Sequence, residues 1–498
     1  MVRTQRSRSE ASHRARPGLE ALEDRCLLSG NVLQTNLVSD LPGVALVKDS
    51  NLVNPWGIAE SSGSPFWIAD NNSNLATLYM VPGAMNTPVS INPLVVNIPT
   101  PVGDTGGAPT GAVFNIDLAH GSFKLRNGSP AIFLFATEDG TIVGWNGGTQ
   151  AVIAKDNSGN NFTEPDPNQQ TGAVYKGLAI AASATPVFAG DADSTAVIYA
   201  ANFRTGQIDV FDSKFKQITL PTGAFTDPHL PDGYAPFNIQ ELGGKLYVTY
   251  AKQDDTKHDD VAGRGKGFVD VYNLDGSPGL ANGKVRLISR GPLNAPWGLA
   301  IAPPGFAGIS APANDPVLLV GNFGDGFINA IDATNGTFLT KVKDPDGEPI
   351  QIDGLWALKV GNGGAGGLMN TVYFTAGIDH EMHGLFGALS TAAPGTPEGP
   401  AEEQRVTAAR DVVQLDRQQL AMDIKNGADR ATIRQDVEQL ETDLADLFRV
   451  QRALQRDARQ DGAGSSNGRG RSAPAHEHDR EDALDAIFAG FRGHRSLD

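Results

Sequence analysis

The hexapeptide N-P-W-G-I-A at residues 54–59 returns at residues 295–300 as A-P-W-G-L-A. Weaker copies lie at residues 109–112, 176–179, 236–239 and 353–357. The chain therefore divides into six units, which start near residues 54, 109, 175, 236, 295 and 352. A repeat of this length accommodates one four-stranded sheet per unit, as in a β-propeller.

Each unit contains four strand-like segments of different character. The first is short and rich in small residues, and the second is a nearly continuous apolar run, as at residues 196–201. The third alternates behind a glycine, as at residues 206–211, and the fourth is more polar, as at residues 284–288. This order suits a blade that is buried near the axis and exposed at its rim. We predict an all-β, six-bladed β-propeller over residues 32–390, with seven blades or an irregular β-sandwich as alternatives.

The sixth unit ends with a third segment at residues 384–389, and a Pro-rich stretch follows it. A spare strand-like segment, residues 33–39, precedes the first unit. Pairing of these two segments would remove two exposed sheet edges. We therefore expect the N-terminal strand to close the ring.

Four segments carry a resemblance to a known family. They are N-L-V-S-D at residues 36–40, L-V-N-P-W-G at 52–57, F-W-I-A-D-N at 66–71 and H-G-L-F-G at 383–387. They resemble a bacterial family of secreted propeller proteins with no assigned biochemistry, and the match covers about residues 32–390. The blades are more loosely similar to NHL-repeat proteins and to gluconolactonase-like six-bladed hydrolases. The resemblance implies fold and export, and it supplies no catalytic residues.

The composition restricts the partners of the chain. Among 498 residues, 57 acidic side chains outnumber 40 basic ones, which gives a net charge of −17. Because phosphate binding needs a concentrated basic face, this charge argues against nucleic acid and against anionic lipid surfaces. No apolar run is long enough to predict a transmembrane segment. Cys26 is the single cysteine, so an intrachain disulfide is excluded.

Residues 1–31 form a basic leader without the apolar core of an ordinary signal peptide. Within it, residues 18–29 resemble the L-E-x-R-x-L-L-S segment that opens many large exported bacterial proteins. The resemblance implies a secreted or cell-envelope location. The alternative is a basic leader that carries no export signal.

In a propeller, the loops that enter each first strand and those that follow each second strand gather on one face. These loops are polar in every unit, so we predict a site there for a small polar ligand or a protein partner. The alternative is that turns favour such residues for their geometry, and that the indoles pack between blades. The predicted ligand-binding residues are Asn54, Trp56, Asp70, Asn71, Glu138, Asp139, Lys176, Asn202, Arg204, Asn238, Trp297, Asn322, Asp353 and Trp356.

One short stretch combines imidazoles with carboxylates: Asp379, His380, Glu381 and His383. These residues are a candidate site for Zn²⁺ or another divalent ion, although their spacing is not the helical H-E-x-x-H. Calcium prefers oxygen ligands, and the loops offer several of them near the axis. The alternative is a solvated acidic loop. The polar insertion at residues 252–266 is expected to be a surface loop or lid. The candidate oxygen ligands are Asp70, Asn71, Glu138, Asp139, Asp353 and Asp379.

After the repeats, residues 391–401 form a Pro/Gly hinge. Residues 402–460 carry apolar positions three and four apart, which predicts a helical hairpin and self-association through it. Residues 461–482 are rich in Gly, Ser and Arg and are predicted to be a disordered linker. Residues 483–498 are predicted to form a short apolar helix or tail.

The repeats predict a fold more strongly than an activity. The favoured function is an exported binding or scaffold propeller that uses its polar-loop face, rather than an enzyme. The alternative is a metal-dependent hydrolase or lactonase in which axial Ca²⁺ or Zn²⁺ activates water. The sequence contains no nucleophile elbow, phosphate loop or zinc-binding set of cysteines.

Overall fold

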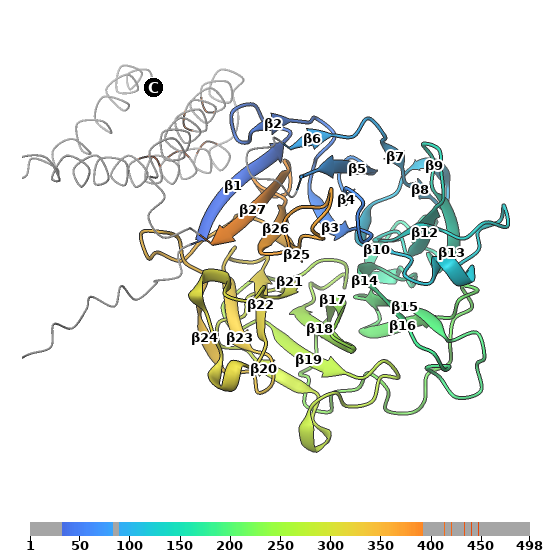
Figure 1. The fold of residues 1–498 in the computed structure, drawn as a ribbon. Helices are drawn as coiled ribbons and strands as arrows, with labels where there is room; N and C mark the ends of the chain where they lie inside the picture. The colour runs from blue at the N-terminus through green and yellow to red at the C-terminus, as the bar shows by residue number, and fades with distance from the viewer. Residues whose placement is uncertain are drawn as a thin grey trace, which may run out of the picture.

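The computed structural model describes residues 32–82 and 89–391, together with residues 413, 420, 433, 440 and 447. Over this part of the chain, six antiparallel sheets stand around a common axis (Figure 1). The predicted six-bladed β-propeller is confirmed. The leader, the linker, the tail and most of the hinge and hairpin lie outside the described residues, although all five isolated positions are helical.

In the first five blades, the strands follow one another along the chain from the axis outward. The first blade contains β3 (Pro55–Ala59), β4 (Phe66–Asp70), β5 (Leu75–Met80), β6 (Ser90–Ile91) and β7 (Val96–Asn97). The second contains β10 (Pro109–Phe114), β11 (Phe133–Thr137), β12 (Thr141–Trp145) and β13 (Val152–Asp156). The third contains β14 (Tyr175–Ala182), β15 (Ala196–Asn202) and β16 (Gln207–Phe211).

The fourth and fifth blades follow the same plan, whereas the sixth takes its two outer strands from the start of the described chain. The fourth contains β17 (Tyr234–Leu242), β18 (Lys245–Lys252), β19 (Phe268–Tyr272) and β20 (Arg286–Ser289). The fifth contains β21 (Pro296–Ile301), β22 (Val317–Asn322), β23 (Ile328–Asp332) and β24 (Phe338–Lys341). The sixth contains β25 (Leu355–Val360), β26 (Thr371–Ala376), β27 (Leu385–Thr391), β1 (Val32–Ser39) and β2 (Val47–Lys48).

Smaller elements join the blades. The hairpin between the first two blades pairs β8 (Pro99–Thr100) with β9 (Gly103–Gly106). The short 3-10 helices are η1 (Leu118–His120), η2 (Pro167–Gln169), η3 (Ala281–Gly283), η4 (Phe306–Gly308) and η5 (Pro312–Asn314). Within the described residues, no helix has the length and apolar character needed to cross a bilayer.

The sixth blade combines both ends of the described chain. β1 lies antiparallel to β27, with Val38 opposite Phe386, and β2 lies parallel to β1 at the rim. Phe386 also packs with Phe66 of the first blade and with Tyr373 of its own blade. The outer strand of this blade therefore precedes the first blade in the sequence.

The six innermost strands, β3, β10, β14, β17, β21 and β25, contact one another in cyclic order around the axis. Glycines allow this close approach. A Cβ atom on Gly111 would lie 2.2 Å from the backbone nitrogen of Leu178, and one on Gly57 would lie 2.4 Å from the carbonyl oxygen of Thr110. Gly177 and Gly298 hold the equivalent places in β14 and β21. The repeated glycine of the hexapeptide thus reflects backbone packing at the axis.

The second strands are buried on both sides, as their apolar runs predict. Every residue of β4, β11, β15, β22 and β26 is buried. Aromatic pairs link neighbouring blades, such as Trp67 stacked on Phe133 with ring centroids 4.2 Å apart.

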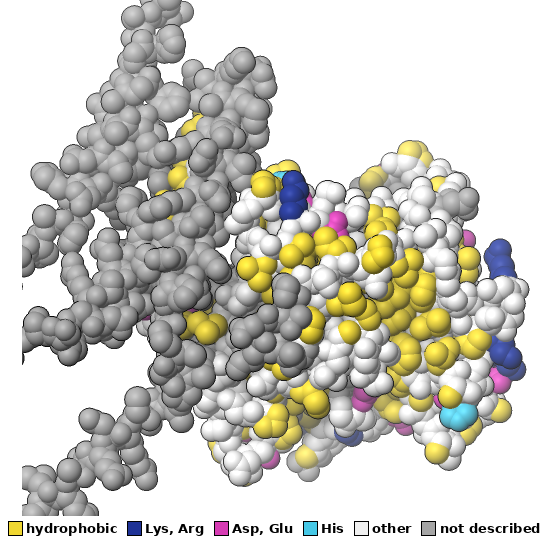
Figure 2. Space-filling view, turned by 45° about the horizontal axis from the view of Figure 1, so that its top comes forward, with side chains coloured by type: hydrophobic (Ala, Val, Ile, Leu, Met, Phe, Trp, Pro, Cys, Tyr) yellow, Lys and Arg dark blue, Asp and Glu magenta, His cyan; other side chains and the backbone are white. Residues whose placement is uncertain are grey.

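On the face of the molecule that Figure 2 shows, hydrophobic side chains are widespread and charged side chains are few and separated.

Replacement of Gly111 by alanine tests the packing at the axis. The added methyl group meets backbone atoms of β14 that cannot move independently, so we expect the free energy of unfolding to fall by about 3 kcal/mol or more. Urea unfolding followed by tryptophan fluorescence measures the change. The matched control is Gly63→Ala, because a Cβ at Gly63 meets no atom within 4 Å. Equal stability of the two variants would contradict the packing argument.

Candidate functional site

Aromatic rings fill the axis of the propeller. Trp56, Trp297 and Trp356 each precede the glycine position of an inner strand, and Phe237 holds the same place in β17. Trp56 stacks on Trp356 with ring centroids 3.5 Å apart, and Trp297 meets both rings edge-on. We call these four residues the axial plug. The predicted indoles are all buried and pack against one another.

A buried lysine continues this ring of positions. Lys176 precedes Gly177 in β14, and its side chain is 2% exposed. Its ammonium lies 5.1 Å from the ring centroid of Trp56. It pairs with the carboxylate of Glu138, which follows β11, and lies 3.0 Å from Asp259, which follows β18. Two loops from different blades thus converge on one cation at the axis.

Three further carboxyl groups lie around Lys176 and its two partners, namely those of Asp139, Asp260 and Glu381. Asn54 donates a 2.7 Å hydrogen bond to Glu381 and Asn71 donates a 2.8 Å bond to Glu138, so amides from the first blade hold both acids. Asp139 accepts a bond from the backbone nitrogen of Ala108. The Oδ2 atom of Asp260 is buried and has no hydrogen-bond partner in the described part of the chain. We call this group of charged side chains the axial cluster. It consists of Glu138, Asp139, Lys176, His258, Asp259, Asp260 and Glu381.

The pKa values of Asp139, Asp259, Asp260 and Glu381 are shifted in different directions. Burial raises the pKa of Asp139 to about 6 and that of Asp260 to about 7, and neighbouring acids add to both shifts. Burial and the charge of Glu138 also raise the pKa of Glu381. Burial acts against ionisation of Asp259 as well, but the hydrogen bond with His258 and the charge of Lys176 together lower its pKa. One ammonium therefore balances only part of the acidic charge.

Sequence analysis missed part of this site. His258, Asp259 and Asp260 lie in the insertion at residues 252–266, which was expected to be a surface loop or lid. Asp254 accepts bonds from the backbone nitrogens of His258 and Asp259, and this fixes the turn. The sequence did contain a signal for these residues. Acidic residues follow the second strand of the fourth blade, as Glu138 follows the second strand of the second blade.

Other predicted ligand-binding residues form hydrogen bonds that hold the loops and strands of the blades. Arg204 donates to Asn161, Gln170 and the carbonyl of Gly172, so it fixes a loop of the third blade. Asn238 takes a glycine position of the inner ring and donates to the carbonyl of Trp297. Three more bond within the blades: Asp70 with Thr77, Asn202 with Asp209, and Asn322 with the carbonyl of Pro292.

The predicted metal-binding stretch does not gather into one ligand set. Glu381 turns to the axial cluster, whereas His383 pairs with Asp40 at 2.7 Å. His383 Nε2 and Asp379 Oδ2 are 4.0 Å apart, and His380 is exposed. Asp353 accepts a bond from the backbone nitrogen of Asp379. The oxygens proposed for calcium are therefore spread over several places, and Asp70 is buried inside its own blade.

In a different group, potential metal-ligand atoms lie close together. One potential ligand atom each from Glu138, His258 and Asp259 lies within 4.8 Å of the others. Two carboxylates and one imidazole are ligands that Zn²⁺ accepts. The Lys176 ammonium contacts the same two carboxylates, so a metal ion and this ammonium would compete for them.

Fold and site together define a six-bladed β-propeller with a charged cluster at one end of a filled axis. The chain is 33% identical over 363 residues to the uncharacterised protein R648 of Acanthamoeba polyphaga mimivirus, covering 71% of this chain and 78% of the viral protein. It is 31% identical over 364 residues to protein L690 of the same virus, covering 71% and 84%. The chain belongs to the family of these mimivirus proteins. These relatives are viral, so the bacterial family suggested by the motifs is not the one that the comparisons identify. No family model matches the chain.

Solved structures show distant likeness in fold. A streptogramin B lyase matches with a TM-score of 0.37 and 13% identity, over 72% of this chain and 97% of the lyase. The PQQ-bound aldose sugar dehydrogenase from Streptomyces coelicolor matches with a TM-score of 0.36 and 12% identity, over 73% and 98%. A putative gluconolactonase matches with a TM-score of 0.26 and 13% identity, over 57% and 90%. Likeness at this level carries no information about activity.

Replacement of Lys176 by methionine tests the charge balance of the axial cluster. Loss of the buried ammonium leaves the acids of the axial cluster without their lysine, so we expect the free energy of unfolding at pH 7.5 to fall by about 3–5 kcal/mol. Without this ammonium the buried acids favour protonation in the folded state, so the deficit should shrink as the pH falls towards 5.

Urea unfolding of both proteins at pH 7.5 and pH 5 measures this difference. Lys214→Met is the matched control, because the Lys214–Asp193 pair lies exposed at the rim and its loss should leave stability unchanged. A deficit for Lys176→Met that is the same at both pH values would show that lost packing, not charge, is responsible.

Proposed function

We propose that the protein is an exported binding propeller whose polar-loop face takes a small polar ligand with a positively charged group. The axial cluster is the proposed binding site. Its acids come from loops of the second, fourth and sixth blades, so they are held by a rigid scaffold rather than by one flexible segment. Rigid placement reduces the entropy lost on binding.

Charge supports a cationic ligand. Five carboxyl groups of the axial cluster face the single ammonium of Lys176, and Glu138 and Asp259 are the two that it contacts. Asp139, Asp260 and Glu381 stay close to this pair without a basic partner of their own at ion-pair distance among the described residues. A cation that enters beside them would relieve their mutual repulsion.

The observation that carries the proposal is the Oδ2 atom of Asp260. A buried carboxylate oxygen that lacks a hydrogen-bond partner costs free energy in the unliganded protein. A ligand ammonium or guanidinium would supply the missing donor. Asp260 is therefore the residue whose change should affect binding most directly.

A metal-assisted hydrolase is the second candidate. It is favoured by the close approach of potential ligand atoms in Glu138, His258 and Asp259. Three protein ligands leave a fourth zinc position for water, which is the arrangement of catalytic zinc sites. In this function Lys176 would have to release both carboxylates. A calcium ion would use the oxygens of Glu138, Asp259 and Glu381 instead.

One experiment separates these functions. Calorimetric titration of the full chain at pH 7.5 uses spermidine, CaCl₂ and ZnCl₂ as separate probes. We expect spermidine to bind, and Asp260→Asn to weaken its binding at least tenfold, because the variant lacks the unpartnered charge. The matched control is Asp193→Asn, which removes an acid from the separate group of Asp191, Asp193 and Asp212 in the third blade and should leave binding unchanged.

The probes have distinct meanings. Binding of Zn²⁺ that is lost in His258→Gln, with no binding of spermidine, would favour the hydrolase. Binding of none of the three probes would contradict both functions.

Export is a separate part of the proposal, supported by the leader resemblance, and cell fractionation in a native host tests it. Self-association through residues 402–460 stays a prediction.

We further propose that β1 closes the ring by tying the sixth blade to the start of the chain. Thr35 and Ala388 lie directly opposite each other across the β1–β27 ladder. Cysteines at both positions, in a Cys26→Ser background, should therefore form a disulfide under mild oxidation.

Because this bond would join residues far apart in sequence, the oxidised protein should be more stable than the reduced one by about 2–4 kcal/mol. Thermal unfolding with and without reductant measures the difference. The matched control pairs Thr35→Cys with Ser390→Cys, which is out of register. Equal cross-linking of both pairs would contradict a fixed β1–β27 register.

A further inference from the structure

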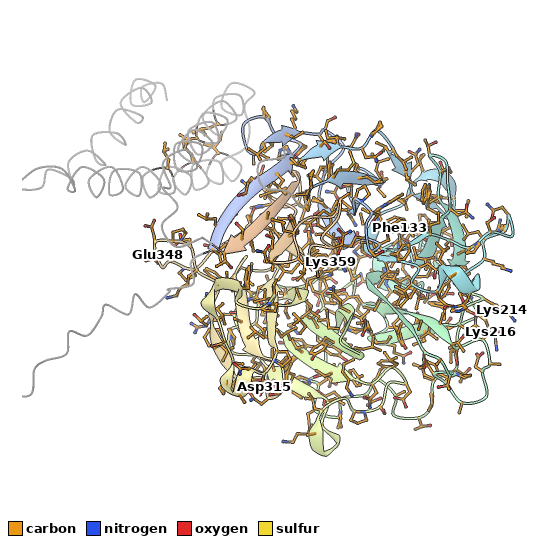
Figure 3. The ribbon with its side chains drawn as sticks, in the orientation of Figure 1. Phe133, Lys214, Lys216, Asp315, Glu348 and Lys359 are labelled. Carbon is orange, nitrogen blue, oxygen red and sulfur yellow. The ribbon has the colours of Figure 1, made fainter. Side chains whose placement is uncertain are left out.

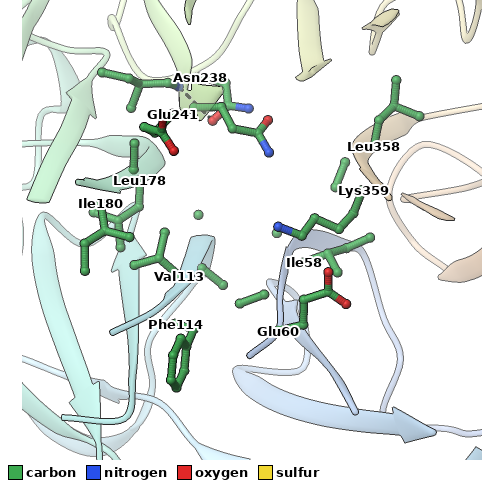
Figure 4. A pocket seen from close by; sticks show the side chains of 18 of the residues that line it. Ile58, Glu60, Val113, Phe114, Leu178, Ile180, Asn238, Glu241, Leu358 and Lys359 are labelled. Atoms are coloured by element: carbon green, nitrogen blue, oxygen red, sulfur yellow. Dashed lines mark hydrogen bonds between the residues drawn. The ribbon is translucent and has the colours of Figure 1, made fainter. Parts of the chain in front are cut away.

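The end of the axis opposite the axial cluster opens into a pocket of about 180 Å³. It lies between the far ends of the inner strands, and Trp297 of the axial plug forms part of its floor. Figure 4 shows side chains from several blades around this opening. We call it the distal pocket. No residue of the axial cluster lines it, so the two sites are separate.

We propose that the distal pocket binds a small zwitterion with an apolar body, of the class of aliphatic α-amino acids. The carboxylate of the ligand would pair with Lys359, and its ammonium would lie against Glu241 across the pocket. This site is independent of the function proposed for the polar-loop face.

A basic group projects into the pocket. Lys359 lies near the end of β25, and its ammonium points towards the open centre in Figure 4. It attracts the charge of Glu60, but it makes no ion pair within the described part of the chain. Figure 3 shows Lys359 close to the axis, whereas Lys214 and Lys216 lie at the rim. An ammonium without a partner in a partly enclosed site favours an anionic group in the ligand.

Acidic groups supply the complementary charge. Glu241, near the end of β17, lies across the pocket from Lys359. Glu60 follows β3, and its Oε2 atom is buried without a hydrogen-bond partner among the described residues. Burial raises the pKa of Glu60 to about 7, although Lys359 acts to lower it. Glu60 thus lies beside Lys359, whereas Glu241 presents its charge from the opposite side of the pocket.

The remaining lining is apolar. Ile58, Val113, Leu178, Ile180 and Leu358 contribute side chains around the charged groups. These walls would bury an aliphatic side chain, and each buried methylene would add to the binding free energy. The free volume of about 180 Å³ is below the roughly 300–1,000 Å³ of sites for drug-sized ligands, so the ligand must be small.

These features exclude simpler ligands. A divalent cation would be repelled by the ammonium of Lys359. A simple anion would leave Glu241 without a cationic partner, and a plain amine would leave Lys359 without an anionic one. A zwitterion pairs with both at once.

Calorimetric titration of the full chain with L-leucine at pH 7.5 tests the proposal. Two analogues separate the parts of the ligand: 4-methylpentanoate lacks the ammonium, and 3-methylbutylamine lacks the carboxylate. We expect leucine to bind and each analogue to bind at least tenfold more weakly. Glycine, which lacks the apolar body, should also bind more weakly than leucine.

Variants locate the site. Lys359→Met and Glu241→Gln should each weaken leucine binding at least tenfold, while Lys214→Met and Glu348→Gln at the rim should leave it unchanged. Asp260→Asn should also leave it unchanged, which separates this proposal from the one for the axial cluster. Thermal unfolding confirms that each variant folds. The proposal is overturned if leucine does not bind at millimolar concentration, if either analogue binds as tightly, or if Lys359→Met has no effect.

Discussion

Six backbones must meet around one axis, and this steric constraint governs the rest of the molecule. Gly57, Gly111, Gly177 and Gly298 let each inner strand lie against the next, because a Cβ at any of them would overlap neighbouring atoms. The residue before each glycine position then faces the centre. Where that residue is aromatic, as at Trp56, it fills the centre with a ring. The hexapeptide is therefore conserved within the chain by packing at the axis.

The axial cluster follows from a single change in this pattern. Lys176 takes a position that indoles occupy in three other blades, and so it brings a charge into the centre of the molecule. A buried ammonium requires nearby carboxylates. They come from loops of two other blades, through Glu138 and Asp259. The charged site is thus linked to the packing of the ring, since the backbone carbonyl of Lys176 also accepts a hydrogen bond from Trp297.

Periodicity made the fold predictable, because each unit repeats the same burial pattern and the blade count follows from the unit count. The site was less predictable. Whether Trp56 meets a ligand or another indole depends on the radius of the ring, which no local pattern encodes. Arg204 lies in a loop of the predicted kind and Asn322 ends β22, yet both donate to backbone carbonyl groups, of Gly172 and Pro292. His258 was missed because an insertion has no equivalent in the other units.

The axial plug also separates the two ends of this propeller. Many propellers have an open central channel, but here the rings of Trp56, Phe237, Trp297 and Trp356 pack against one another at the axis. The axial cluster and the distal pocket therefore lie on opposite sides of the axial plug, and a ligand bound at one end does not touch a ligand bound at the other.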